Sequence, residues 1–94
     1  MAAGQNNANI LVVDDNEMNR DILSRTLQRA GYQVRTAEDG QRGLDYLSET
    51  PFDLVLLDIM MPGISGLEVL EQIRDQYDIT ELPVVMVTAK DGSQ

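Results

Sequence analysis

Cysteine, long apolar runs and basic residues are absent or scarce in this chain, and each shortage excludes a class of function. Without cysteine the protein forms neither a disulfide nor a thiolate metal site, in agreement with a cytoplasmic location. No segment is apolar over the length that a membrane-spanning helix needs. Seven basic residues face sixteen acidic ones, and the net charge of −9 repels phosphate backbones and anionic lipids. We therefore expect neither a nucleic acid nor a membrane as a partner, whereas a basic protein or a divalent cation suits this charge.

The remaining composition is that of one small globular domain. Hydrophobic residues make up 43% of the 94-residue chain and charged residues 24%, which is typical of a soluble folded protein. This length suffices for a single core. Residues 1–9 are small and polar with nothing to bury, so we expect them to form a flexible N-terminal lead-in. The folded domain is then expected to occupy residues 10–94.

Short apolar segments alternate with amphipathic segments along the chain. Strands are predicted at Ile10–Val13, Gln33–Ala37, Leu54–Leu57 and Leu82–Val87. Helices are predicted from the N-cap Asn16 to the terminating Gly31, from about Gly40 to Ser48, and from Gly66, after a capping box of Ser65 and Glu68. The order βαβαβαβ predicts an α/β fold: a three-layer, doubly wound parallel sheet with right-handed crossovers and helices on both faces.

Each predicted helix has apolar positions with which to cover the sheet. In the first helix these are Met18, Ile22, Leu23, Thr26, Leu27 and Ala30. In the third they are Val69, Leu70, Ile73 and Tyr77. The second helix buries Leu44 and Leu47, but Gly40 and Gly43 weaken it on helix propensity alone.

Carboxylates follow two of the predicted strands at the point where each strand ends. Asp14 and Asp15 follow the first strand, and Asp58 follows the third. Because the carboxyl ends of parallel strands meet at one edge of a sheet, where ligands bind, we expect these side chains to converge. Like charges a few ångströms apart repel by roughly 1–4 kcal/mol per pair at effective dielectric constants between about 80 and 20. A hard divalent cation with oxygen ligands, such as Mg²⁺, would offset this repulsion.

A cation beside a carboxylate nucleophile makes a site that receives a phosphoryl group. The metal neutralises the incoming oxygens while Asp58 attacks phosphorus and forms an acyl phosphate. Thr88, at the end of the fourth strand, is placed to donate a hydrogen bond from its hydroxyl to a phosphoryl oxygen. The backbone amide of Ala89 supplies a second donor.

Each of these residues also has an ordinary structural explanation when taken alone. Asp14 and Asp15 between a strand and a helix serve N-capping and the helix dipole, and a strand-end Asp58 is commonly a turn residue. Met60 and Met61 are expected to pack the loop rather than to form a binding surface. The functional interpretation rests on their common position at one edge of the sheet.

These motifs resemble the receiver (phosphoacceptor) domain of two-component response regulators. The matching residues are Leu11-Val12-Val13-Asp14-Asp15-Asn16, Asp58 with Met61-Pro62 and Gly66, and Leu82-Pro83-Val84-Val85-Met86-Val87-Thr88-Ala89. The resemblance implies a flavodoxin-like sheet with strand order 2-1-3-4. It implies that a histidine kinase or a phosphotransfer protein is the phosphodonor and that an output domain or partner responds in the parent protein.

The resemblance also implies a role for each site residue. Asp58 is then the phosphorylated residue, Asp15 a direct Mg²⁺ ligand, Asp14 a ligand through water, the Met60 carbonyl a further ligand, and Thr88 the switch hydroxyl. On this interpretation the protein is not a conventional enzyme but a receiver that catalyses its own phosphorylation at Asp58.

The chain departs from the family after its fourth predicted strand, where receivers continue through a helix, a strand and a helix. The family carries a switch aromatic residue and a phosphate-contacting lysine on the fifth strand, and Lys90, two residues after Thr88, is not that lysine. Loss of one charge-assisted contact is expected to cost on the order of 1.5–3 kcal/mol and to slow phosphotransfer by one or two powers of ten.

The missing segments also lead us to expect self-association. The fourth strand becomes an apolar sheet edge that only Pro83 guards, and such an edge pairs with other chains. The helix that should cover the first strand from one side is missing too, which predicts an exposed apolar face there. A homodimer or a higher assembly through the fourth-strand edge is the expected result.

Three alternatives compete with an active receiver. One is a phosphorylation-impaired fragment that works as a self-association or protein-interaction module. A phosphohydrolase of the haloacid-dehalogenase type needs a second aspartate two residues after the nucleophile, and Asp58-Ile59-Met60 lacks it. A nucleotide-binding domain needs a glycine-rich phosphate loop, and none follows the first strand.

Overall fold

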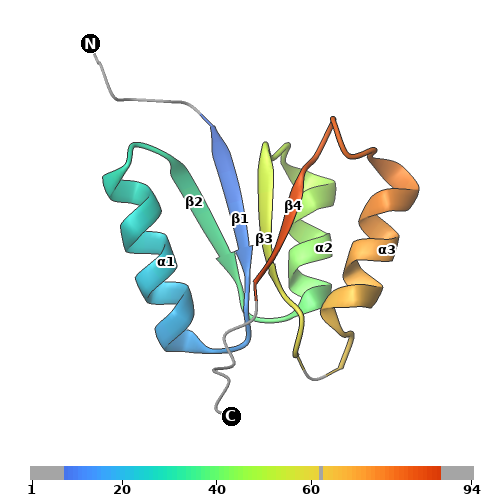
Figure 1. Ribbon diagram of the computed structural model, residues 1–94, viewed down its shortest axis with the longest axis horizontal. Helices are drawn as coiled ribbons and strands as arrows, with labels where there is room; N and C mark the ends of the chain where they lie inside the picture. The colour runs from blue at the N-terminus through green and yellow to red at the C-terminus, as the bar shows by residue number, and fades with distance from the viewer. Residues whose placement is uncertain (1–7, 62, 88–94) are drawn as a thin grey trace.

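The structure is a computed structural model that describes residues 8–61 and 63–87 (Figure 1). Its elements in chain order are β1 (Asn9–Val13), α1 (Glu17–Arg29), β2 (Gln33–Ala37), α2 (Gly40–Glu49), β3 (Leu54–Asp58), α3 (Gly66–Gln76) and β4 (Val84–Val87). The predicted alternation of strands and helices is therefore confirmed. β1 begins one residue earlier than predicted, and β4 begins after Pro83 rather than before it. No helix in the described part of the chain is long and apolar enough to cross a membrane.

The four strands form one parallel sheet in the order β2-β1-β3-β4, as the resemblance implied. In Figure 1 α1 lies on one side of the sheet, while α2 and α3 lie on the other. The expected three-layer, doubly wound architecture is thus confirmed. This strand order places β1 and β3 side by side at the centre, so the residues that follow them lie next to each other.

Local signals in the sequence set the ends of the helices. The Asn16 side chain accepts a hydrogen bond from the Asn19 amide at 2.9 Å and caps α1. Gly31 adopts a φ of 99°, and the amides of Gly31 and Tyr32 bond back to the last turn of α1 in a Schellman arrangement. The predicted capping box of α3 is also confirmed, because Ser65 and Glu68 each bond the other's backbone amide.

The core lies between the sheet and the α2–α3 layer. It is built from alternate residues of the strands, the inner faces of these two helices and two loop residues. Its buried members are Leu11, Val13, Ala37, Leu47, Val55, Leu57, Met61, Val69, Ile73 and Leu82. The glycines of α2 allow close packing here: a Cβ atom on Gly40 would lie 2.6 Å from Val69, and one on Gly43 would lie 2.8 Å from Val13. The low helix propensity of α2 is therefore a consequence of its close approach to β1 and α3.

The layer on the α1 side is thinner, and two expectations about it are wrong. None of the α1 residues is buried, and the predicted apolar positions Met18 and Ile22 are 69% and 55% exposed. The apolar face at β1 is not exposed as expected, because Ile10 and Val12 are only 2% and 1% exposed and α1 packs against β1 and β2. Within the described strands, the large apolar residue that is exposed is Val85, on the edge strand β4.

Gly66 makes the tightest backbone contact between α3 and β3. A Cβ atom at this position would overlap the Asp58 carbonyl oxygen and lie 2.7 Å from the Ile59 Cα atom. The Gly66 amide also donates a hydrogen bond to the Ile59 carbonyl at 3.1 Å. The first residue of α3 is therefore held directly against the end of β3.

Gly66→Ala is expected to lower the free energy of unfolding by about 1–3 kcal/mol, because the added methyl group overpacks a backbone contact. Helix propensity alone predicts the opposite sign, a gain of about 1 kcal/mol. Urea denaturation measures the difference. Leu67→Ala, at the next and exposed position, is the control and should change stability by less than about 1 kcal/mol. A Gly66→Ala protein as stable as the wild type would contradict the packing argument.

Candidate functional site

Three carboxylates meet at the carboxyl edge of the central strands. Val13 and Leu57 are register partners in the parallel pair β1–β3, so Asp14 and Asp58, the next residues, lie level with each other. One carboxylate oxygen each from Asp14, Asp15 and Asp58 lies within 4.8 Å of the others. The convergence predicted from the sequence is confirmed.

The three members of this acidic cluster differ in exposure. Asp14 and Asp58 are only 2% and 4% exposed, while the Asp15 side chain is open to solvent. Two negative charges therefore form the floor of the site, and the third stands at its rim. A cation or an anionic group would reach the cluster from the Asp15 side.

Backbone amides hold the buried carboxylates in place. An Asp14 carboxylate oxygen accepts a hydrogen bond from the Asn16 amide at 2.9 Å, and the Asp14 amide donates to the Ala37 carbonyl at 3.1 Å. An Asp58 oxygen accepts from the Met60 amide at 3.1 Å. The two floor carboxylates are thus fixed by the turns that follow their own strands.

The electrostatics of Asp58 reflect this crowding. Loss of hydration on burial is the largest cause that raises its pKa above the ordinary value of 3.8. The hydrogen bond from Met60 lowers the pKa in part, and the negative charges of Asp14 and Asp15 raise it again. The ionised form of Asp58 is therefore less favoured in the folded protein than in the unfolded chain, and positive charge in the site would oppose this effect.

The donor set of the acidic cluster fits a hard divalent cation. All three side chains offer oxygen ligands, and two of them are buried anions close to a third. Mg²⁺ prefers one or two carboxylates with positions left for water and phosphate oxygens. Asp14, Asp15 and Asp58 would hold such an ion, and its positive charge would offset the repulsion among the three carboxylates.

The remaining predicted site residues are placed as follows. Met60 follows the acidic cluster in the loop after β3, where its amide bonds Asp58 and its side chain is 58% exposed. The expectation of loop packing is confirmed for Met61, which is 8% exposed and belongs to the core, but it is wrong for the exposed Met60 side chain. Thr88, Ala89 and Lys90 lie outside the described residues. The last described residue, Val87, is the register partner of Asp58.

Sequence analysis missed Arg20, which contacts the acidic cluster from α1. One of its guanidinium nitrogens donates a hydrogen bond to the Asp14 carbonyl oxygen at 2.8 Å. An arginine in the first turns of a helix is ordinarily solvent-facing, so its residue type gave no signal. The only sequence cue is its position four residues after the N-cap Asn16.

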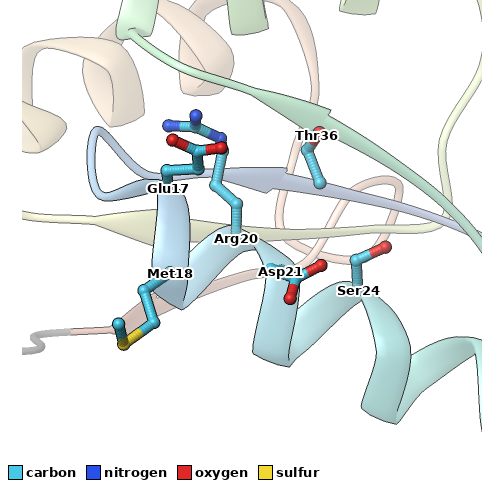
Figure 2. A pocket seen from close by; sticks show the side chains of 6 residues that line it. All are labelled: Glu17, Met18, Arg20, Asp21, Ser24 and Thr36. Carbon is cyan, nitrogen blue, oxygen red and sulfur yellow. The ribbon is translucent and has the colours of Figure 1, made fainter.

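An open surface groove lies beside α1 rather than at the acidic cluster. Its volume is about 670 Å³, and Figure 2 shows the side chains that line it: Glu17, Met18, Arg20, Asp21, Ser24 and Thr36. None of the three clustered carboxylates is among them. This groove is a shallow surface feature, and the chemistry of the site belongs to the acidic cluster.

Asp58→Asn is expected to raise the melting temperature at neutral pH in the presence of a chelator, because it removes a charge that burial disfavours. The folded pKa of Asp58 is raised, so its stabilising contribution is complete below the unfolded value of 3.8 and is lost as the pH rises through the folded value. The advantage of Asp58→Asn should therefore shrink as the pH falls toward 3.8. Thermal unfolding at several pH values measures it, and a pH-independent difference would contradict this electrostatic account.

Comparison with known proteins supports the fold and identifies the family. The family pattern described as the response regulator receiver domain matches residues 10–94. The chemotaxis protein CheY4 of Vibrio cholerae is 37% identical, with a TM-score of 0.82 over 94% of this chain and 73% of its own.

Two structures of the response regulator TrrA from Thermotoga maritima are also similar. One, in complex with Mg²⁺–BeF, is 43% identical with a TM-score of 0.83 and covers 89% of this chain and 71% of its own. The other, in complex with the histidine kinase ThkA, is 41% identical with a TM-score of 0.81 over 93% of this chain and 73% of its own. With its parallel sheet, its acidic cluster and this match over residues 10–94, the chain belongs to the family of response regulator receiver domains.

Proposed function

We propose that this receiver domain is a phosphoacceptor in which Asp58 takes a phosphoryl group from a phosphohistidine, with Mg²⁺ as the cofactor. The observation that carries the proposal is the meeting of three carboxylates from two neighbouring parallel strands within 4.8 Å. The donor is a histidine kinase or a phosphotransfer protein. In its support, the similar TrrA protein has been seen in complex with a histidine kinase and, separately, with Mg²⁺–BeF.

The proposed reaction is a direct transfer between two side chains. A carboxylate oxygen of Asp58 attacks phosphorus, the phosphorus–nitrogen bond of the phosphohistidine breaks, and the imidazole leaves with the bonding electron pair. The product on this chain is an acyl phosphate. A bound Mg²⁺ supplies positive charge that neutralises the phosphoryl oxygens during this step.

The chain's own residues divide the work of holding the ion and the phosphoryl group. Asp15, at the exposed rim, and the buried Asp14 would hold the ion, and the family resemblance implies a direct contact for Asp15 and a contact through water for Asp14. Asp58 would offer a carboxylate oxygen, and the family resemblance implies that the Met60 carbonyl would be a further ligand. The Thr88 hydroxyl and the Ala89 amide would donate hydrogen bonds to the phosphoryl group.

Ion binding and nucleophile activation are coupled in this site. Asp58 attacks only as a carboxylate, yet burial and its two acidic neighbours raise its pKa. A cation among the three acids reverses the balance of charge and favours the ionised form. A bound cation would therefore lower the pKa of Asp58 toward its ordinary value as well as neutralise the phosphoryl oxygens.

Incubation with a small phosphodonor such as acetyl phosphate is expected to add one phosphoryl group to the wild type in the presence of Mg²⁺. Asp58→Asn should abolish this addition, and Asp15→Asn should reduce it by weakening the ion. Intact-mass spectrometry measures the modification. The matched control is Asp75→Asn, an exposed acid of α3 outside the acidic cluster, which should be labelled like the wild type. Labelling that persists in Asp58→Asn would show that the phosphoacceptor is another residue.

A second candidate function is self-association, which the edge strand β4 favours. β4 consists of the four apolar residues Val84–Val87 and has a neighbour, β3, on one side only within the described sheet. Val85 is 46% exposed on this strand. An apolar edge with open hydrogen-bonding groups is a template for another strand, so we propose a homodimer through β4.

Light scattering is expected to give a mass above that of the monomer at tens of micromolar protein. Val85→Lys should shift the protein toward the monomer, because a charged side chain on an edge strand opposes pairing. Ile79→Lys, an exposed apolar position outside the sheet, is the control and should leave the mass unchanged. A wild-type protein that is monomeric and folded at these concentrations would contradict the dimer.

A further inference from the structure

Arg20 is the basic residue that connects α1 to the acidic cluster. Its Nη1 atom donates to the Asp14 carbonyl oxygen at 2.8 Å, and the contact is partly buried. Figure 2 shows the guanidinium turned back toward the start of α1, on the side of Glu17. In the same turn the Arg20 amide bonds the Asn16 carbonyl at 3.0 Å, so its backbone is fixed as well. The side chain thus reaches the end of β1 from a rigid helical position.

Asp14 is held at its amide, its carboxylate and its carbonyl, and Arg20 makes the last of these contacts. The amide of Asp14 donates to Ala37, and its carboxylate accepts from the Asn16 amide. Both of these partners are backbone atoms. Of these three hydrogen bonds, the one from Arg20 comes from a partner's side chain, so a substitution at Arg20 removes it.

The Asp14 carbonyl controls the placement of the next residue. The peptide group is planar, so the direction of this carbonyl fixes the plane that contains the Asp15 nitrogen and Cα atom. Asp15 is the exposed member of the acidic cluster, so burial does not hold its side chain in place. The Arg20 hydrogen bond therefore orients the peptide from which the rim carboxylate projects.

We propose that Arg20 is a positioning residue for the metal site: by fixing the Asp14 carbonyl it orients Asp15 toward the cation. This inference rests on the Mg²⁺ site of the proposed function. Arg20 touches neither the ion nor the phosphoryl group in this account, and its effect passes through the Asp14–Asp15 peptide. Groups that orient metal ligands from outside typically change metal affinity by about 10–100-fold when they are mutated.

Arg20→Gln is expected to weaken Mg²⁺ binding by about tenfold, measured by calorimetric titration of the purified chain. Arg20→Lys, which keeps the charge and a donor, should restore part of the affinity. The control is Arg25→Gln on the same helix, whose side chain is 72% exposed and pairs with Asp21 at 3.2 Å; it should bind Mg²⁺ like the wild type. Urea unfolding in chelator accompanies each titration to separate affinity from stability.

A second measurement separates positioning from a purely structural role. In Arg20→Gln the Mg²⁺ concentration for half-maximal labelling by acetyl phosphate should rise by about tenfold. The labelling rate at saturating Mg²⁺ should stay close to that of the wild type. Unchanged Mg²⁺ affinity in Arg20→Gln, or a loss of stability in chelator without a loss of affinity, would overturn the role of Arg20 while leaving the proposed function intact. A wild-type chain that binds no Mg²⁺ would overturn both.

Discussion

The mutual repulsion of Asp14, Asp15 and Asp58 is the constraint on which the rest of the structure depends. Parallel pairing in the register Val13–Leu57 delivers these acids to one point, and two of them are buried there. Each close pair costs roughly 1–4 kcal/mol at effective dielectric constants of about 80 to 20. Such a local conflict is typical of functional sites, where a ligand relieves what the fold alone leaves unfavourable.

The helix layers on the two faces of the sheet contribute differently to holding the three carboxylates close together. The α2–α3 layer contains the close-packed core. Gly40 lets α2 approach α3, Gly43 lets α2 approach β1, and Gly66 lets α3 approach the end of β3. The α1 layer has no buried residue, so α1 relies on half-buried leucines and on the hydrogen bond from Arg20. The α2–α3 layer packs the strands into the core, while α1 contributes the Arg20 hydrogen bond that orients Asp15.

Sequence patterns predicted the elements, the caps of α1 and α3, and the convergence of the acids, because all of these follow from local chemistry and parallel strand order. They failed where burial depends on neighbours in space. Met18 and Ile22 fit an apolar helical stripe, yet they are exposed, since no described element covers that side of α1. Arg20 was missed because its partner is a backbone carbonyl. Every residue has such a carbonyl, so the sequence does not indicate which one an arginine will bind.

The most direct test of this account is the thermal stability of the wild-type chain as a function of Mg²⁺ concentration at neutral pH. If the cation offsets the repulsion within the acidic cluster, the melting temperature rises steadily with Mg²⁺, and a hundredfold excess over the dissociation constant adds about 2.7 kcal/mol of stability. A melting temperature that stays constant up to millimolar Mg²⁺ would contradict the central claim that these three carboxylates form a cation site.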